Sequence, residues 1–490
     1  MSDTLRRVDG DALSRAVFAA GRRLGRSDAF LARELADAAL HFLATAEGDD
    51  PDEVLQRVVR ELGHPDLALA LQSAGTEGRP APIAADELPA TALERVHRAA
   101  ALAFRELARR DVYSPDLVAA ADAGLITFFD ADSPTELAGG VIAVGDPSAA
   151  FETILAARER YGQFVVFDGP EYSLSNGRSA AVWARWLRAG LLATGLRAIV
   201  NLNCPNRNSD ELPLFPNEPD DRDARLDDLR QTLIAHLLWE GASSVRIDWH
   251  MTERDFRADG RIRLLRLCRR ALAGNPIAFV FDRGVRVPLA EGIDRVFPEL
   301  LCAIGVNLPR LAAHLGEHGE GILKRMVTLG RLATAAGRAR RAYLRRQGRP
   351  ELTEGFRLER ARIAVVPIGL GSFAGYTTDD SGIELAQSAL RALRLGLDET
   401  GCLDSPPGWI HDPAAGVTCW GVGNPRQQVL RSALLHAEIE AGTAVIELPP
   451  TERPAEELAH LLWVGSRTPG LVRVRIRRSR AVQPSLGPDW

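Results

Sequence analysis

From residue 91 onward, the chain alternates between short apolar runs and longer amphipathic segments. The apolar runs are rich in β-branched or aromatic side chains, and most are followed by Gly, Pro, Asn or Asp, which is typical of buried strands. Segments with helical spacing separate most of the runs, the clearest at 222–238 and 382–397. Strands alternating with helices predict an α/β fold with a mostly parallel sheet, either open or closed into a barrel. The expected strands are 164–167, 198–202, 245–249, 277–281, 303–306, 363–368, 444–448 and 471–476.

The N-terminal part of the chain has a different pattern, in which apolar positions recur at helical spacing. Leu13, Val17 and Ala20 share one helical face, and a later helix is expected to start at Asp50-Pro51, because an acidic residue and a proline are typical of a helix start. Residues 74–90 contain few large apolar side chains and read as a linker. We therefore expect a small, mostly helical domain at 1–73, a linker at 74–90 and an α/β domain at 91–490.

Composition narrows the functional classes. The chain has 490 residues and 46% hydrophobic content, enough for a large core. A net charge of −5 argues against nucleic acid as a partner. The sequence has no apolar run of membrane-spanning length and no signal-peptide pattern at its start, so no membrane association and a cytoplasmic location are expected.

The cysteines are scattered along the sequence. None of them forms a C-x-x-C pair, so the pattern predicts neither a disulfide framework nor a zinc knuckle. We expect buried free thiols and no bound metal. The five cysteines are Cys204, Cys268, Cys302, Cys402 and Cys419.

One polar cluster is a candidate for chemistry. It lies at the end of the apolar run at 245–249 and just after it, the usual place for active sites in α/β folds, and consists of Asp248, His250 and Glu253. Asp248 and His250 are two residues apart, so on a strand they share one face. With Cys204 at another strand end, they could form a general acid–base or metal site. The alternative is a polar strand exit with ordinary surface charge, since isolated motif matches are often false.

A further motif follows the run at 300–306. The chain continues through Asn307-Leu308-Pro309-Arg310 into a long amphipathic segment, and Pro309 places the helix start at or after itself. This strand, turn and helix resemble the anaerobic, glycyl radical ribonucleoside-triphosphate reductases, which carry an N-L-P-R motif there. The resemblance implies the ten-stranded α/β barrel of glycyl radical enzymes for 91–490, with Asn307, Pro309 and Arg310 as its motif residues.

The N-terminal domain resembles an ATP-cone, the regulatory domain that precedes many ribonucleotide reductases. Its closest match to the cone pattern lies at the end of the domain, in DEVLQRVVRELG. The resemblance implies that the domain binds ATP or dATP, because arginines near a helix start can hold a triphosphate. The alternative is a helical cap whose arginines are solvated, since the family's hairpin is shortened here. The residues that match the cone's nucleotide-binding motif are Arg6, Arg7, Asp9, Gly10 and Arg15.

The sequence departs from the reductases at both radical positions. The family passes a radical from a glycine in a C-terminal R-V-x-G-Y loop to a cysteine that precedes N-L-P-R. Here Val285 stands in the matching Gly-x-Arg frame, and no R-V-x-G-Y occurs near the C-terminus. Cys302 lies within the following apolar run and is expected to be a core cysteine. We therefore expect a degenerate homologue without reductase activity, which senses nucleotides or acts as a homodimer or with a partner protein. Two alternatives stay open: a working radical enzyme with differently placed motifs, and a non-radical enzyme that uses the barrel cavity.

Overall fold

The fold is described from a computed structural model of the chain. It divides into two compact units, Met1–Val96 and His97–Trp490, each of which is described by itself. The structure describes residues 10–25, 35–36, 38–43, 50–76, 92–204, 219–238, 244–282, 287–290, 292–315, 320–353, 357–370, 373, 381–404, 424–440, 442–448 and 454–478.

The first unit is helical in its described part. Helix α4(Pro65–Thr76) packs against both α1(Gly10–Arg23) and α3(Pro51–Glu61). The side chain of Asp50 accepts a hydrogen bond from the backbone N–H of Asp52 at 3.0 Å, and Pro51 occupies the first turn, which confirms the expected helix start. The apolar face expected for the first helix is also confirmed, since its three residues join a small core of Leu13, Val17, Ala20, Leu35, Ala36, Ala39, Leu55, Val59, Leu67, Ala68, Ala70 and Leu71.

The second unit is built on a large, mostly parallel sheet. Its strands follow the order β11-β10-β9-β2-β3-β4-β5-β6-β13-β12, and β1 pairs with β9 at the side of this path. The strands are β1(Ile126–Phe128), β2(Leu137–Val141), β3(Tyr161–Asp168), β4(Arg197–Leu202), β5(Val245–Met251), β6(Ile277–Phe281), β9(Glu299–Asn307), β10(Arg362–Ile368), β11(Gly401–Leu403), β12(Thr443–Leu448) and β13(Arg473–Arg478).

The sheet consists of two groups of parallel strands that run in opposite directions. Strands β2 to β6 are parallel to one another, as are β9 to β11 and the pair β12–β13. The groups meet at two antiparallel joints, β2 with β9 and β6 with β13. At the second joint Arg473 lies opposite Val280, and Arg475 lies opposite Ala278.

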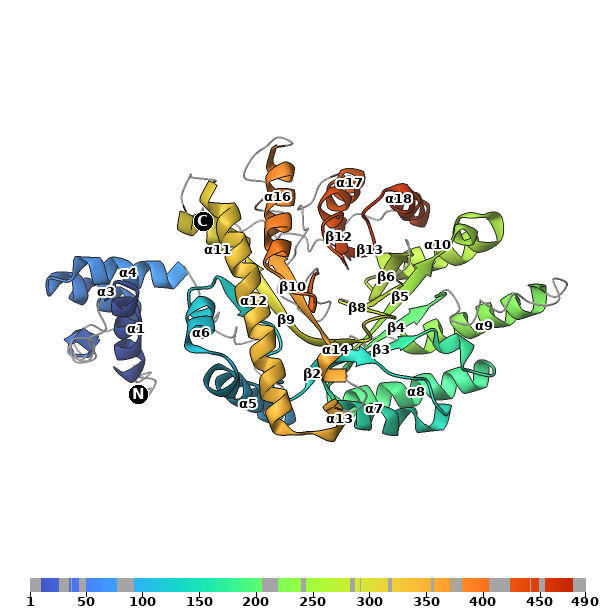
Figure 1. The fold of residues 1–490 in the computed structure, drawn as a ribbon, viewed down its shortest axis with the longest axis horizontal. Helices are drawn as coiled ribbons and strands as arrows, with labels where there is room; N and C mark the ends of the chain where they lie inside the picture. The colour runs from blue at the N-terminus through green and yellow to red at the C-terminus, as the bar shows by residue number, and fades with distance from the viewer. Residues whose placement is uncertain are drawn as a thin grey trace, which may run out of the picture. The chain divides into compact units, whose positions relative to one another are not determined.

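One face of the sheet, here called the outer face, is covered by helices, which lie around the outside of the strands in Figure 1. Most connections between parallel neighbours contain a helix, as crossovers in α/β folds require. The main helices are α5(Ala92–Leu107), α6(Pro115–Asp122), α7(Ala150–Arg158), α8(Gly177–Thr194), α9(Pro219–Leu237), α10(Ala258–Leu272), α11(Leu308–Leu315), α12(Glu320–Gln347), α16(Ser381–Leu395), α17(Pro425–His436) and α18(Ala455–Arg467).

The opposite face, here called the inner face, is filled by a short hairpin rather than by helices. Strands β7(Pro288–Ala290) and β8(Ile293–Asp294) form this hairpin between β6 and β9. The amide Nδ2 of Asn201 donates to the carbonyl of Leu289 at 2.9 Å, which ties the hairpin to β4. Leu289, Ala290 and Ile293 pack against buried side chains of six strands: Ala138, Phe164, Val166, Ile199, Leu300, Ala303, Ala364 and Cys402.

All eight strands expected from apolar runs are confirmed, within a few residues at their ends, as are the helices expected at 222–238 and 382–397. The sequence pattern missed β1, β2, β7, β8 and β11, which are short. For β2 there is a second reason: it contains Gly139 and Gly140, and glycine has a low strand propensity. A Cβ on Gly139 would lie 2.3 Å from the ring of Phe164, and one on Gly140 would lie 2.5 Å from that of Tyr161. The close approach of these rings requires the two glycines.

Asn307 lies at the carboxyl end of β9, as expected for the N-L-P-R motif. Its Oδ1 accepts a hydrogen bond from the backbone N–H of Arg310 at 3.0 Å and so caps α11. The helix begins at Leu308, one residue before Pro309, which corrects the expected start by one position. Arg310 Nε donates to the carbonyl of Ala123 at 3.3 Å, so the motif fastens this turn to the end of α6.

Four of the five cysteines lie in the described residues and are buried free thiols, as the sequence predicted: Cys204, Cys268, Cys302 and Cys402. Cys419 lies outside the described residues. Within the described residues, none of the helices is both long and apolar enough to cross a membrane.

His436, on the last turn of α17, gives a test of stability against pH. Its side chain is buried, neither ring nitrogen has a hydrogen-bond partner, and burial lowers its pKa from 6.5 to about 4. The unfolded chain therefore binds a proton near pH 6.5 that the folded chain does not bind until about pH 4, so stability falls as the pH falls through this window.

We expect His436→Leu to leave the free energy of unfolding at pH 7 nearly unchanged, because no hydrogen bond is lost. At pH 4.5 the variant should be more stable than the wild type by about 2–3 kcal/mol. Urea unfolding at both pH values measures this difference, with the exposed His236 on α9 replaced by Gln as the control. Equal acid sensitivity of wild type and His436→Leu would contradict the assignment.

Candidate functional site

The candidate site lies on the inner face at the carboxyl ends of β3, β4, β5 and β6, the usual place for chemistry in α/β folds. Side chains alternate between the two faces of a strand. Strand β5 places Val245, Ile247, Trp249 and Met251 in the outer core, so Arg246, Asp248 and His250 face inward. Asp248 and His250 therefore share one face, as the spacing in the sequence predicted.

Asp248 is held between two arginines. Its Oδ1 accepts from Arg246 Nε at 2.6 Å, and its Oδ2 accepts from Arg246 Nη2 at 2.9 Å. Arg473 Nε, from β13, lies 3.0 Å from Asp248 Oδ2, and neither Asp248 nor Arg473 is exposed to solvent. Both carboxylate oxygens are thus engaged, and the residue serves as a charged link rather than as a free base.

His250 lies between a carboxylate and an amide. Its Nδ1 is 2.8 Å from Asp282 Oδ1, and its Nε2 is 2.9 Å from Asn201 Oδ1. The Asn201 amide nitrogen donates to the Leu289 carbonyl, which fixes its oxygen toward the imidazole. Both ring nitrogens therefore face oxygen atoms of neighbouring side chains, which fix the orientation of the imidazole from two sides. His250 is buried, whereas the side chain of Asp282 is 18% exposed, so Asp282 connects the ring to solvent.

Cys204 follows β4 at the same end of the sheet. Its side chain is buried on the inner face, and its carbonyl accepts from the Tyr172 hydroxyl at 2.7 Å. Burial, assisted by the carboxylates of Asp168 and Glu171, raises the pKa of the thiol well above its usual value. Cys204 is therefore a neutral thiol at physiological pH. The structure brings it into the group that contains His250 and Asp282, whose carboxylate acts on its pKa as well.

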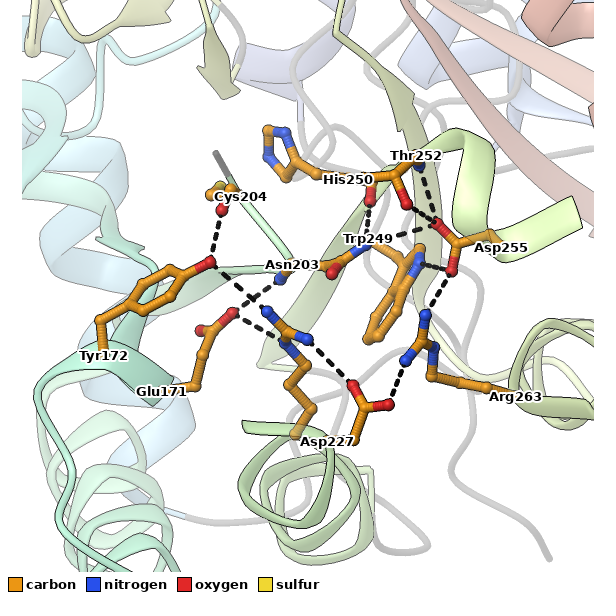
Figure 2. Close-up of polar contacts among 11 residues, drawn as sticks. Glu171, Tyr172, Asn203, Cys204, Asp227, Trp249, His250, Thr252, Asp255 and Arg263 are labelled. Carbon is orange, nitrogen blue, oxygen red and sulfur yellow. Dashed lines mark hydrogen bonds and ion pairs between the residues drawn. The ribbon is translucent and has the colours of Figure 1, made fainter. Parts of the chain in front are cut away.

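A hydrogen-bonded network behind the strand ends holds these groups in place (Figure 2). Asn203, which has a positive φ of 63°, donates through Nδ2 to the carbonyl of His250 at 2.6 Å. Its backbone N–H donates to Glu171 Oε1 at 2.7 Å, and the same oxygen accepts from Arg230 Nε at 3.2 Å. Burial raises the pKa of the Glu171 carboxyl, against the opposing effect of the Arg230 guanidinium. The network thus fixes the strained turn that positions Cys204.

Asp255 closes the other side of this network. Its Oδ2 accepts from the backbone N–H of Thr252 at 2.7 Å, and its Oδ1 accepts from Arg263 at 3.0 Å and from Trp249 Nε1 at 3.3 Å. Asp227 lies between Arg263 and Arg230 and so joins the two halves of the network (Figure 2).

Several residues named from the sequence lie elsewhere. Glu253 is exposed in a short helix and pairs with Arg257 at 3.4 Å, so the structure does not bring it to His250. Gly10 is the first residue of α1, and Arg15 lies on the same helix, but the side chain of Arg15 lies outside the described part. The remaining named positions, Arg6, Arg7, Asp9 and Val285, lie outside the described residues, so their roles stay predictions.

Asn201 and Asp282, the two partners of His250, were not predicted from the sequence. Each had a signal, because Asn201 lies near the end of an apolar run and Asp282 directly follows one. Among the described residues there is no group of three His, Cys, Asp or Glu side chains that could hold a metal ion. The arrangement places a buried imidazole, His250, in contact with the carboxylate of Asp282, a pairing that is used in acid–base chemistry, whereas Cys204 is held as a neutral thiol.

Comparisons with known proteins identify the fold. No family model matches the chain, and no curated protein matches it in sequence. Among solved structures, the anaerobic ribonucleotide reductase from Thermotoga maritima with citrate in the active site matches with a TM-score of 0.55 and 11% identity, over 86% of this chain and 94% of that one. The same enzyme in complex with dATP and CTP matches with a TM-score of 0.53 and 11% identity, over 78% of this chain and 81% of that one.

A third structure of that enzyme, with MES in the active site, covers 97% of this chain and 92% of its own, with a TM-score of 0.50 and 11% identity. At such low identity the likeness concerns the fold alone. The chain therefore has a mixed α/β fold similar to that of the anaerobic ribonucleotide reductases.

The arginines around Asp248 lead to a test of the site. Asp248→Asn leaves Arg246 and Arg473 buried without a carboxylate between them, and should lower the free energy of unfolding by about 3–5 kcal/mol. Arg473→Met leaves Asp248 paired with Arg246 and fills the space with an apolar chain, so it should cost far less. Chemical unfolding of both variants measures the two values. If they were equal, the carboxylate would not be the shared link.

Proposed function

We propose that this chain is a degenerate homologue of the anaerobic ribonucleoside-triphosphate reductases, with their barrel and without their reductase activity. The strand order supports a closed barrel of ten strands, five in each parallel group, with β1 outside it. The outermost strands of the path are β11 and β12. The backbone N–H of Glu440, just before β12, donates to the carbonyl of Leu403 in β11 at 3.2 Å, which supports closure between them.

The observation that carries the loss of activity is the residue at position 285. The segment between β6 and β9 crosses the inner face, where the hairpin β7–β8 packs against six strands. By the family resemblance, the hydrogen-abstracting cysteine belongs in this segment, and the sequence has Val285 there. A valine side chain has no sulfur and cannot form a thiyl radical.

Cys302 does not supply the missing sulfur. It lies within β9 and packs in the outer core, on the face away from the hairpin. Burial raises the pKa of its thiol to about 12, as for a core cysteine. The sequence also contains no R-V-x-G-Y motif, in which the family resemblance would place the radical glycine, so two separate observations support the same proposal.

For the N-terminal unit, the proposed function is the binding of ATP or dATP. Gly10 begins α1, and Arg15 lies in its second turn, near the helix end where backbone N–H groups favour a phosphate. The cone-like sequence adds Arg6 and Arg7 just before this helix. Nucleotide sensing, by a homodimer or together with a partner protein, is the role that this combination favours.

The proposal predicts that the protein cannot reduce ribonucleotides. Anaerobic incubation with a radical-SAM activase, a reductant and nucleoside triphosphates should yield no glycine-centred electron paramagnetic resonance signal and no deoxynucleotide. Val285→Cys alone should restore neither, because the radical glycine is missing as well. An active anaerobic reductase treated in parallel is the control. A glycine-centred doublet, or turnover above a sample without protein, would falsify the proposal.

Nucleotide binding is tested separately. Calorimetric titration of the full chain with ATP and with dATP should show binding that weakens with salt. Arg15→Ala should reduce the binding free energy by about 1.5–3 kcal/mol, the size of one charge-assisted hydrogen bond. Arg60→Ala, at an exposed position in the last turn of α3, is the matched control and should bind as the wild type does. No heat with either nucleotide at millimolar concentration would leave the unit without this function.

A further inference from the structure

A cavity of about 340 Å³ lies beside the candidate site, at the carboxyl ends of β5 and β6. This volume falls within the range of small-molecule pockets, about 300–1,000 Å³. One wall comes from the residues that follow β5, and the other from the last turn of α18, which precedes β13. The cavity therefore lies at the joint between the two strand groups. Its lining residues are Met251, Thr252, Glu253, Phe256, Arg257, Phe281, Asp282, Trp463, Ser466 and Arg467.

The cavity is lined by four charged residues, of which the cation Arg467 has no ion-pair partner among the described residues. Glu253 and Arg257 form an ion pair at 3.4 Å, and the Asp282 carboxylate lies against the imidazole of His250 at 2.8 Å. Arg467 is exposed and has no hydrogen bond or ion pair within the part of the chain that the structure describes. Glu253 and Asp282 thus each have a partner, and the Arg467 guanidinium is the cation of the lining that can pair with an anionic group of a ligand.

The apolar part of the lining is mostly aromatic. The side chain of Trp463 is 44% exposed although it lines the cavity, and Phe256, Phe281 and Met251 complete this wall. The Trp463 indole stacks with the ring of His460, whose centroid lies 5.8 Å away, and stays partly exposed next to Arg467, which has no partner among the described residues, so it offers a flat apolar surface beside a positive charge. This combination suits a planar ring that carries an anionic group.

Asp282 adds a third recognition element. Each carboxylate oxygen keeps a lone pair after the contact with His250, and the residue lines the cavity with 18% of its side chain exposed. Behind it, Asn201 holds the far side of the imidazole at 2.9 Å, so the carboxylate is fixed in position. It can accept a hydrogen bond from a donor group on the ligand.

We propose that this cavity binds a small aromatic acid that also carries a hydrogen-bond donor. The anion pairs with Arg467, the ring packs against Trp463, and the donor reaches Asp282. This proposal does not depend on the loss of reductase activity or on nucleotide binding by the N-terminal unit. Its test can therefore fail without affecting those two proposals.

Four probes separate the three recognition elements: 4-hydroxybenzoate has all of them, benzoate lacks the donor, 4-hydroxybenzamide lacks the charge, and inorganic phosphate lacks the ring. Calorimetric titration of the full chain at pH 7 should rank 4-hydroxybenzoate first. The dissociation constant should rise about tenfold when the charge is removed, the effect of one charge-assisted bond, and by a smaller factor when the donor is removed.

Two variants locate the binding. Arg467→Gln should raise the dissociation constant for 4-hydroxybenzoate about tenfold and leave that for 4-hydroxybenzamide unchanged. Trp463→Leu should weaken both compounds and remove the change in tryptophan fluorescence on binding. Arg185→Gln, an exposed arginine on α8, is the matched control.

Three results would overturn the proposal: no binding of any aromatic probe at millimolar concentration, equal binding of 4-hydroxybenzoate and 4-hydroxybenzamide, or unchanged binding to Arg467→Gln. Because Arg467 and Trp463 are exposed, both variants are expected to fold, and circular dichroism checks this directly.

Discussion

The inner face of the sheet depends on the carboxylate of Asp248. It contacts Arg246 on its own strand and Arg473 on β13, and all three side chains are buried. Buried ions are tolerated only when they compensate one another. The link crosses β6, where the residues opposite Arg473 and Arg475 are Val280 and Ala278, whose small side chains leave room for the arginine. One charge pair thus fastens the two groups of strands at a joint where only a few backbone pairs meet.

Most of the fold could be predicted because most strands are buried on both faces. Such strands give continuous apolar runs, and each of the eight runs in the sequence corresponds to a strand. The strands that escaped prediction carry little hydrophobic signal. Strand β2 reads Leu-Ala-Gly-Gly-Val, and β11 has three residues. Their positions are set by neighbours distant in the sequence, which a local pattern does not contain. Hydrophobic periodicity shows which face of a strand is buried but not whether a sheet closes. The barrel was therefore expected only from the resemblance to the anaerobic reductases.

The candidate site was predictable in part for the same reason. The two-residue spacing of Asp248 and His250 placed them on one face, and the structure confirms this. Their different roles were not predictable, because each depends on a residue from another strand. Arg473 engages Asp248 only because β13 lies antiparallel beside β6. Asp282 and Asn201 engage His250 only because β4, β5 and β6 end together. Glu253 is close to His250 in sequence, yet the turn after β5 carries it to the surface.

The paired glycines of β2 have a consequence for how the chain finds its native pairing. Side chains on consecutive residues point to opposite faces, so Gly139 and Gly140 leave a vacancy on each side of the strand. The rings of Phe164 and Tyr161 occupy these two vacancies. A shift of β2 by one residue along β3 would press Ala138 or Val141 into a ring and turn the strand over. Missing side chains therefore act as a steric lock on register, at the strand that also joins the first group to β9.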